Sequence, residues 1–430
     1  MRVLMTEGAS SSARQSLYGV PRSATVDLCA PSWMVQCRFS SRIRRVLTAP
    51  RVSSDPFGFL TFLRKQVDSG RYDVLLPTHE ETYLLSRFRD ELGLKIGLAV
   101  PPFAAIRRVL GKIQFAEFAA EIGLPTPATQ VGTADEVLAD PPAFPCFLKT
   151  EFGTASQSVR RVDDFAALLS AIDELRADAG YDVQQRLLLQ QPASGIHCTV
   201  QSVFQAGRLI GIHMAQAEEV GFLGTPMIRV GCRHPGVEEN VRRVGESLAW
   251  HGPIFMEYFF DPISGKSSFI EINPRIGEVS NAWLSGTNLV EATLRIALGQ
   301  RCDPLPPGRL GVRSHAGFVW LILEAAEGGN RRAVWRRARY IRQLSRLTPA
   351  VESETTRFRD DPLSLLPAIK TCAHLLCSPH SAQQMLTGAV DAYALSASAV
   401  RQIDEESDRW EMPPKDAAPR PDAPATHGNV

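Results

Sequence analysis

Charged and amide side chains follow an apolar run in the stretch FIEINPRIGE, residues 269–278. A strand that only filled a core would end in a turn, whereas this one leads into Glu271, Asn273 and Arg275. Side chains alternate between the two faces of a strand, so we expect Phe269, Glu271 and Asn273 to share one face. The stretch is therefore a candidate ligand-binding edge.

A second carboxylate is expected opposite this run. Residues 253–261 and 266–273 have the pattern of two antiparallel strands joined by the turn sequence DPISG. Glu257 lies near the middle of the first strand and can point to the same side as Glu271 and Asn273. Two carboxylates and one amide oxygen suit Mg²⁺ that carries substrate phosphates, and such carboxylates repel each other unless a cation lies between them.

The alternative is an exposed hairpin with incidental acidic residues. For Glu257 alone this alternative would be the better interpretation. Apolar neighbours on both strands argue against it once the whole set is considered: Phe255, Phe259, Phe260 and Ile272.

A metal that carries phosphates requires cations nearby, and two lysines are placed to supply them. Lys112 begins a helical pattern, and Lys149 ends a predicted strand. Each alone is more typical of a surface lysine than of a ligand. The loop after Lys149 has small residues that let backbone N–H groups approach phosphate oxygens, namely Gly153, Thr154, Ser156 and Ser158. The loop is not a P-loop, because GxxxxGK[ST] is absent.

Four segments in this order resemble the ATP-grasp superfamily of ligases, above all its bacterial carboxylate–amine ligases. The resemblance runs from about residue 70 to about residue 300. It rests on GKIQFAEFAAEIGLPTPAT, FPCFLKTEFGTASQSV, LLLQQPASGIHCTV and IFMEYFF with FIEINPRIGE. It implies an ATP-grasp fold of the α/β class, in which two subdomains enclose the nucleotide.

The resemblance implies an ATP site. Lys112 and Lys149 correspond to the two lysines that hold the phosphates. Ser156 belongs to the implied phosphate loop. The implied hinge, whose backbone contacts adenine, consists of Gln190, Gln191, Pro192 and Ala193. His197 is the last implied nucleotide contact. Many relatives have an acidic residue on the ribose where this chain has His197, so either an equivalent hydrogen bond or a core histidine is expected there.

The resemblance also implies the metal ligands and one catalytic residue. Glu257, Glu271 and Asn273 correspond to the Mg²⁺ ligands, and Mn²⁺ is an alternative ion. Arg275 corresponds to the arginine beside the reacting phosphoryl group. A fixed guanidinium there would stabilise charge that develops on an acyl phosphate.

Local patterns predict individual elements. We expect a strand at 94–101. A helix is expected from residue 112 to Gly123, with Ala120 among its apolar residues at helical spacing. We also expect a hairpin turn at 205–207 and one helix at 281–300.

The order of elements predicts several structural units. Strand and helix signals alternate at the N-terminus, which indicates a parallel α/β sheet. We expect an N-terminal α/β domain, two ATP-grasp subdomains with the metal site in the second, a helical C-terminal region and a disordered tail, with the boundaries 1–105, 106–188, 189–304, 305–412 and 413–430.

Composition limits the class of protein. The chain has 430 residues and a formal net charge of +1, which gives no reason to expect nucleic-acid binding. The first residues resemble neither a signal peptide nor an anchor, and no apolar run is long enough to span a membrane. The 8 cysteines include no CxxC pair, so reduced thiols in the cytoplasm are the default expectation.

Two further motifs have weaker interpretations. The basic segment 328–344 is more typical of a solvated helix face than of an RNA-binding surface. The segment CAHLLCSPH contains Cys372, His374, Cys377 and His380, but their spacing fits no standard zinc finger. Helix packing is the better interpretation there.

The resemblance implies a ligase that uses ATP and Mg²⁺. It would convert a small carboxylate to an acyl phosphate with release of ADP, and an amine would then attack to form an amide. Three alternatives remain open: a bicarbonate- or carbamoyl-phosphate-type enzyme on the same fold, a non-catalytic ATP-binding protein, and an RNA-associated protein. The sequence names neither substrate and does not indicate the oligomeric state.

Overall fold

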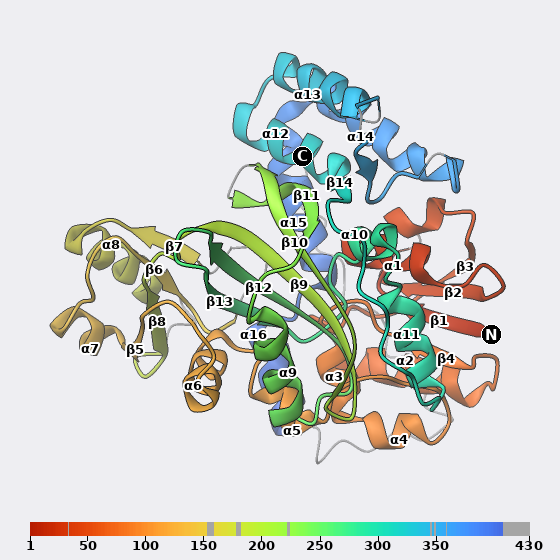
Figure 1. Ribbon diagram of the computed structural model, residues 1–430, viewed down its shortest axis with the longest axis horizontal. Coiled ribbons are helices and arrows are strands. Elements are labelled where there is room, and N and C mark those ends of the chain that lie inside the picture. The colour runs from red at the N-terminus through yellow and green to blue at the C-terminus, as the bar shows by residue number, and fades with distance from the viewer. Residues whose placement is uncertain are drawn as a thin grey trace.

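Three β-sheets organise the described part of the chain and lie side by side in Figure 1. The structure is a computed structural model, and it describes residues 1–32, 34–152, 159–177, 182–221, 224–344, 346–347, 350–357 and 359–406. In Figure 1 the N-terminal sheet lies at the right, a seven-stranded sheet in the middle and a small four-stranded sheet at the left. The helices within residues 317–377 lie at the top.

The N-terminal sheet is parallel throughout, in the strand order β3-β2-β1-β4. Its strands are β1 (Arg2–Thr6), β2 (Thr25–Ala30), β3 (Ile43–Thr48) and β4 (Val74–Leu76). The helices of this region are α1 (Ser11–Gly19), α2 (Pro56–Asp68), α3 (Thr82–Arg87), α4 (Arg89–Gly93) and α5 (Phe103–Arg107), and a short 3-10 turn η1 spans Gln36–Phe39. The predicted parallel α/β sheet is confirmed.

One predicted strand of this region is wrong. The pattern of residues 94–101 suggested a strand, but the structure has a single bridge there, between Gly97 and Val74 of β4. Gly97 exchanges backbone hydrogen bonds with Asp73 and Leu75. The ladder does not extend, and Pro101 and Pro102 follow at once without the N–H groups that a further ladder would need.

The small sheet has the order β5-β8-β6-β7. Its strands are β5 (Thr129–Thr133), β6 (Cys146–Lys149), β7 (Val159–Val162) and β8 (Arg186–Gln190), and its helices are α6 (Lys112–Ile122), α7 (Ala134–Ala139) and α8 (Phe165–Arg176). Helix α6 ends at Gly123, whose φ of 65° is left-handed, as its sequence predicted. Its buried face contains Phe115 and Phe118, whereas Ala120, one of the apolar residues at helical spacing, is exposed.

The seven-stranded sheet has the order β13-β12-β9-β10-β11-β14-β15. Its strands are β9 (Ile196–Gln205), β10 (Arg208–Val220), β11 (Pro226–Cys232), β12 (Gly252–Asp261), β13 (Lys266–Asn273), β14 (Arg313–His315) and β15 (Glu352–Ser353). The hairpins β9–β10 and β12–β13 confirm both predicted turns. Helix α9 (Val237–Ser247) follows β11, and the single helix expected at 281–300 is instead two, α10 (Ser280–Ser285) and α11 (Leu289–Ala297), because Gly286 adopts a left-handed φ of 97°.

The C-terminal region is helical, with α12 (Gly317–Gly328), α13 (Arg331–Leu344), α14 (Leu365–Cys377), α15 (Ala382–Tyr393) and α16 (Ala397–Glu406). Two 3-10 turns, η3 (Pro362–Ser364) and η4 (Pro379–Ser381), flank α14. Helix α16 and the residues before it return to the central core, where Leu395, Val400 and Ile403 share one apolar cluster with Phe118 of α6 and Trp250. The predicted disordered tail, 413–430, lies outside the described residues.

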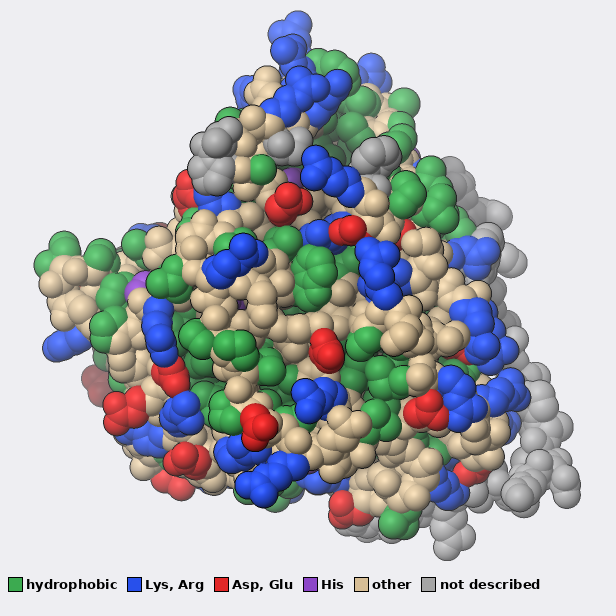
Figure 2. Space-filling view, turned by 45° about the vertical axis from the view of Figure 1, so that its right-hand side comes forward, with side chains coloured by type: hydrophobic (Ala, Val, Ile, Leu, Met, Phe, Trp, Pro, Cys, Tyr) green, Lys and Arg blue, Asp and Glu red, His purple; other side chains and the backbone are tan. Residues whose placement is uncertain are grey.

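The basic helix α13 has internal partners for part of its charge. The Arg337 guanidinium lies 4.1 Å from the ring centroid of Trp320 and 2.8 Å from a carboxylate oxygen of Glu324. Figure 2 shows one face of the molecule, where Lys and Arg side chains are interspersed with Asp and Glu. Across the described ranges no group of three or more His, Cys, Asp or Glu could hold a metal ion, and the cysteines and histidines of CAHLLCSPH lie on α14 and η4. The search for membrane spans covered the same residues and found no helix that is both long and apolar enough.

Candidate active site

The hairpin β12–β13 places two carboxylates opposite each other. Glu257 pairs directly with Glu271, and Phe255 pairs with Asn273. Directly paired residues point to the same side of a sheet, so Glu257 and Glu271 share one face. Both line one cavity of about 600 Å³ together with Asn273.

The expected position of Phe269 is wrong. The register of the hairpin shifts after Glu257, so that Tyr258 pairs with Phe269 and Ile270 is the extra residue of the bulge. An extra residue reverses the alternation on its strand, which turns Phe269 away from Glu271. Phe269 is fully buried in the core, where its ring centroid lies 5.4 Å from that of Tyr258.

The pKa values of the two facing carboxyl groups, Glu257 and Glu271, are shifted in opposite directions. Burial favours the neutral acid in both. In Glu257 the hydrogen bond and charge of His197, with the charge of Arg275, outweigh burial and lower the pKa. In Glu271 burial and the charge of Glu257 together raise the pKa, while the lysines Lys112 and Lys149 only partly offset them. Such a divided pair is the expected result when two carboxyl groups share one site.

Arg275 is fixed beside the hairpin. Its Nη2 donates to Asn273 Oδ1 at 3.0 Å, and its Nη1 donates to the Ile276 carbonyl at 3.3 Å. Its Nε is buried and has no hydrogen-bond partner among the described residues. A buried donor without a partner is costly, and an oxygen-rich anion in the cavity would satisfy it. The donor set therefore fits Mg²⁺ and phosphate, while metal binding itself stays a prediction.

His197 lies in the site and is not a core histidine. Its Nε2 lies 2.9 Å from Glu257 Oε2, and its ring stacks on Phe259 with centroids 5.2 Å apart. It lines the same cavity as Glu271 and Lys112. The expected contact with a ribose stays a prediction, and the contact with Glu257 was not foreseen.

The other predicted nucleotide residues that the structure describes lie on the small sheet and its hinge and are not among the residues that line that cavity. Lys149 Nζ donates to Gln190 Oε1 at 2.8 Å, and burial, with Lys112 nearby, lowers the pKa of Lys149 to about 8. The backbone N–H of Gln191 donates to Ala128, so that donor is already used. Ala193 is half-buried, and Ser156 lies outside the described residues.

Comparisons with known proteins give the fold. No family model and no curated protein matches the sequence. An L-amino acid ligase from Bacillus licheniformis matches 69% of this chain and 74% of its own, with 16% identity and a TM-score of 0.51. Biotin carboxylase from Campylobacter jejuni matches 72% and 74%, with 15% identity and a TM-score of 0.56. N5-carboxyaminoimidazole synthetase from Staphylococcus aureus, complexed with ADP, matches 76% and 86%, with 14% identity and a TM-score of 0.58.

The chain has the ATP-grasp fold. Lys149 ends β6 of the small sheet, while Glu257 and Glu271 lie on β12 and β13 of the large one. The charges of the two carboxylates act on Lys149. The arrangement brings the predicted phosphate-binding and metal-binding residues to one region of the ATP-grasp core.

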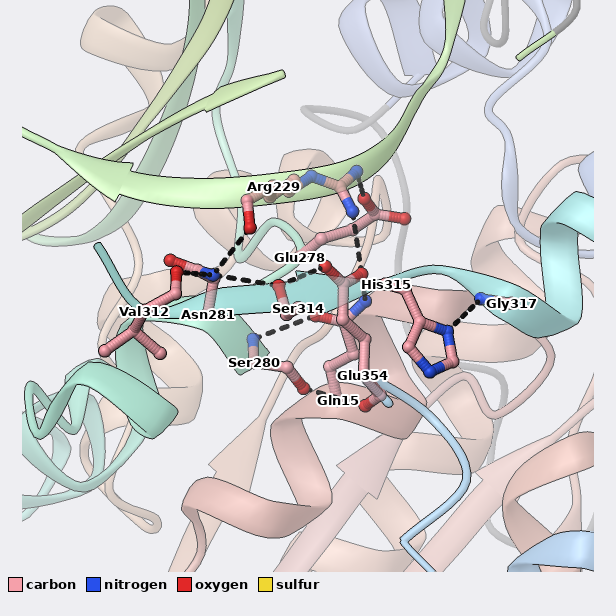
Figure 3. Close-up of polar contacts among 10 residues, drawn as sticks. All are labelled: Gln15, Arg229, Glu278, Ser280, Asn281, Val312, Ser314, His315, Gly317 and Glu354. Carbon is pink, nitrogen blue, oxygen red and sulfur yellow. Dashed lines mark hydrogen bonds and ion pairs between the residues drawn. The ribbon is translucent and has the colours of Figure 1, made fainter. Parts of the chain in front are cut away.

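Sequence analysis missed a buried acid–base cluster next to this site. Arg229 of β11 lies between Glu278 and Glu354 in Figure 3, with Nη1 2.7 Å from Glu354 Oε2 and Nη2 paired with Glu278 Oε2. Arg229 and Glu278 line the same cavity as Glu257. Glu278 belongs to the stretch that first indicated a site, but Arg229 and Glu354 have no local signal.

Glu354 accepts hydrogen bonds from residues of several elements. Its carboxylate accepts hydrogen bonds from Gln15 of α1 at 3.2 Å and from Ser314 of β14 at 2.8 Å. Its backbone carbonyl accepts from Ser280 of α10 at 2.8 Å (Figure 3). The cluster therefore joins the N-terminal domain, the large sheet and the segment after β15 beside the cavity.

Proposed function

We propose that the protein is an ATP-dependent carboxylate–amine ligase that releases ADP and phosphate. A carboxylate substrate would be converted to an acyl phosphate, and an amine would displace the phosphate to give an amide. The fold alone does not select this reaction, because ATP-grasp neighbours include carboxylases as well as a ligase. The proposal rests on the side chains of the cavity.

The single observation that carries the proposal is the set Glu257, Glu271, Asn273 and Arg275 in one cavity with Lys112. The two carboxylates and the amide oxygen would hold Mg²⁺, which would neutralise charge on the terminal phosphates of ATP. A metal held by few protein oxygens and by substrate phosphates is the usual arrangement for Mg²⁺.

Each basic residue has a proposed role that follows from its position. Lys112 and Lys149 would bind phosphate oxygens, and Arg275 would stabilise the negative charge that develops as the carboxylate oxygen attacks the γ-phosphorus. His197 would hold Glu257 in its orientation through their 2.9 Å contact. These residues position and stabilise, and they form no covalent bond with the substrate.

The test uses hydroxylamine as a small nucleophile. The full chain is incubated with ATP, MgCl₂, hydroxylamine and mixtures of small carboxylic acids, including amino acids. We expect a hydroxamate of one acid and an equal amount of ADP. AMP as the stoichiometric product would contradict the acyl-phosphate mechanism, and ADP release that depends on bicarbonate alone would favour the bicarbonate-type alternative. ATP binding without turnover with any acid would favour the non-catalytic alternative.

A further inference from the structure

Glu278 presents an incompletely paired carboxylate to the cavity. Its Oε2 pairs with Arg229, and within the described residues its Oε1 accepts no hydrogen bond. Its side chain is 27% exposed, whereas that of Glu354 on the other side of Arg229 is 1% exposed. Of the two carboxylates paired with Arg229, Glu278 is therefore the one that is accessible from the cavity.

Arg229 has two carboxylate partners. Arg229 supplies one positive charge, and its first carboxylate partner, Glu354, is buried and further satisfied by Gln15 and Ser314. Glu278 then places a second carboxylate on the same guanidinium, and burial raises the pKa of that carboxyl. A cationic ligand at short range would favour its ionised form.

Another wall of the same cavity is apolar. Helix α12 contributes Phe318, Val319, Ile322 and Leu323, which lie on one helical face by their spacing, and α15 contributes Met385 and Leu386. Phe318, Val319, Met385 and Leu386 are only half-buried by the protein. A ligand that covers them would remove apolar surface from water.

We propose that the amine substrate binds here as an ammonium ion on Glu278, with an apolar substituent against α12 and α15. The Glu278 carboxylate would accept a proton from the ammonium group, and the free amine would then attack the acyl carbon as phosphate leaves. This inference rests on the proposed ligase function, since it assigns the second substrate of that reaction. Glu278 lines the same cavity as Glu257 and Arg275, so the ammonium group would share that cavity with the proposed acyl phosphate. The amine is therefore a compound with a hydrophobic substituent and with no anionic group next to its ammonium group.

The other cavity charges fit different ligands. Lys112 and Arg275 are cationic and suit phosphate, while Glu257 and Glu271 face each other and suit the metal. Glu80 also lines the cavity, but its Oε2 already accepts the backbone N–H of Leu395 at 2.6 Å. Glu278 is therefore the acidic residue that we assign to the ammonium group, with the apolar residues of α12 and α15 on another wall of the cavity.

The first experiment measures direct binding to the full chain by calorimetry, which needs no turnover. The probes are 2-phenylethylamine, 2-aminoethanol and 3-phenylpropanoate. We expect 2-phenylethylamine to bind at least about tenfold more tightly than 2-aminoethanol, and 3-phenylpropanoate not to compete with it. Displacement of 2-phenylethylamine by 3-phenylpropanoate, or no binding of either amine, would overturn the proposal.

Variants test the two halves of the site separately. Glu278→Gln is expected to weaken 2-phenylethylamine binding about tenfold by removing the charge. Val319→Thr keeps the side-chain shape and adds a hydroxyl to the apolar wall. We expect it to weaken 2-phenylethylamine binding severalfold. Glu246→Gln, an exposed acid on α9, is the matched control and should bind like the wild type. Unchanged binding in a folded Glu278→Gln protein would refute the ammonium site, and circular dichroism checks the fold.

Failure of this inference and failure of the ligase proposal give different results. Hydroxylamine carries no charge at neutral pH and has no apolar substituent, so hydroxamate formation by the wild-type protein reports the ligase proposal alone. Hydroxamate formation without amine binding would refute only the ammonium site. Amine binding without hydroxamate formation from any acid would refute the ligase proposal.

Discussion

Lys149 carries its positive charge where burial makes that charge costly. Burial is the main cause that lowers its pKa to about 8, from 10.5, and the charge of Lys112 adds to it. The carboxylates Glu271 and Glu257 oppose the shift only in part. A phosphate group would supply the counter-charge that the protein alone leaves incomplete.

We therefore predict that nucleotide affinity falls as the pH rises above about 8. The ligand-free Lys149 loses its proton through that range, and binding to phosphate must then restore it. Calorimetric dissociation constants for ATP from about pH 7 to about pH 10 measure the effect. Lys149→Arg should bind with a flatter pH profile because Arg stays charged, and Lys149→Ala should lose about tenfold or more in affinity at pH 7. Equal affinity of wild type and Lys149→Ala would remove Lys149 from the site.

Glu271 provides a second test at the scale of one residue. Its folded-state pKa is raised by burial and by Glu257, so its ionised form destabilises the ligand-free protein once the pH exceeds that pKa. We predict that Glu271→Gln raises the free energy of unfolding at neutral pH, by on the order of 1 kcal/mol. The same variant, like Glu271→Ala with Asn273→Ala, should lose Mg²⁺-dependent turnover. Urea denaturation with and without MgATP measures both effects, and stabilisation by MgATP equal to that of wild type would contradict the metal role.

At the scale of elements, the site depends on how closely β8, β9 and β12 approach. Gly195 lies between β8 and β9 with a φ of 105°, and a Cβ there would lie 2.2 Å from the Phe260 carbonyl oxygen. Gly265, in the β12–β13 turn, has a φ of 68° and open space around it. At Gly195 a side chain would meet both an unfavourable positive φ and a steric clash. At Gly265 it would meet the unfavourable φ only.

We predict that Gly195→Ala destabilises the protein more than Gly265→Ala does. The turn variant should lose about 1 kcal/mol from the left-handed conformation alone. The Gly195 variant must also move β12 or the β8–β9 connection, which adds strain beside His197. Urea denaturation gives both free energies of unfolding. Equal losses would show that the backbone near Gly195 adjusts freely.

The bulge in β13 shows the limit of local pattern at this scale. Alternation correctly placed Glu271 with Asn273 and Glu257, because all three lie on one side of the irregularity. It placed Phe269 wrongly, because Ile270 is inserted between them. A bulge depends on how the strand packs against its partner and core, so a period-two pattern does not reveal it.

At the scale of the whole molecule, the C-terminal region completes the cavity and the core. Residues of α12, α15 and α16 line the cavity, and Tyr83 of α3 donates to Asp404 of α16 at 2.6 Å. Leu395, Val400 and Ile403 are almost fully buried in the central core. The helical character of this region was predicted, whereas its contact with the N-terminal domain was not.

Two truncations test this role. A chain ending at residue 412 should keep its stability and activity, because the composition of 413–430 offers little apolar surface to bury. A chain ending at residue 393 loses three large buried side chains, each worth about 1.5–3 kcal/mol, and should unfold at lower urea or not fold. Urea denaturation and ADP release compare the two proteins. Lost activity at 412, or wild-type stability at 393, would contradict these assignments.

The sequence by itself determined the local features of the site. The β12–β13 hairpin, helix α6 with its Gly123 end, and the common face of Glu257 and Glu271 all follow from short-range periodicity and turn chemistry. Only the tertiary structure decided that Arg229 would join Glu278 to Glu354. These residues belong to segments far apart in the chain, and no local pattern encodes which distant carboxylate compensates a buried guanidinium. That choice depends on how the sheets and the C-terminal helices pack, since a buried charge is stable only where packing brings its partners.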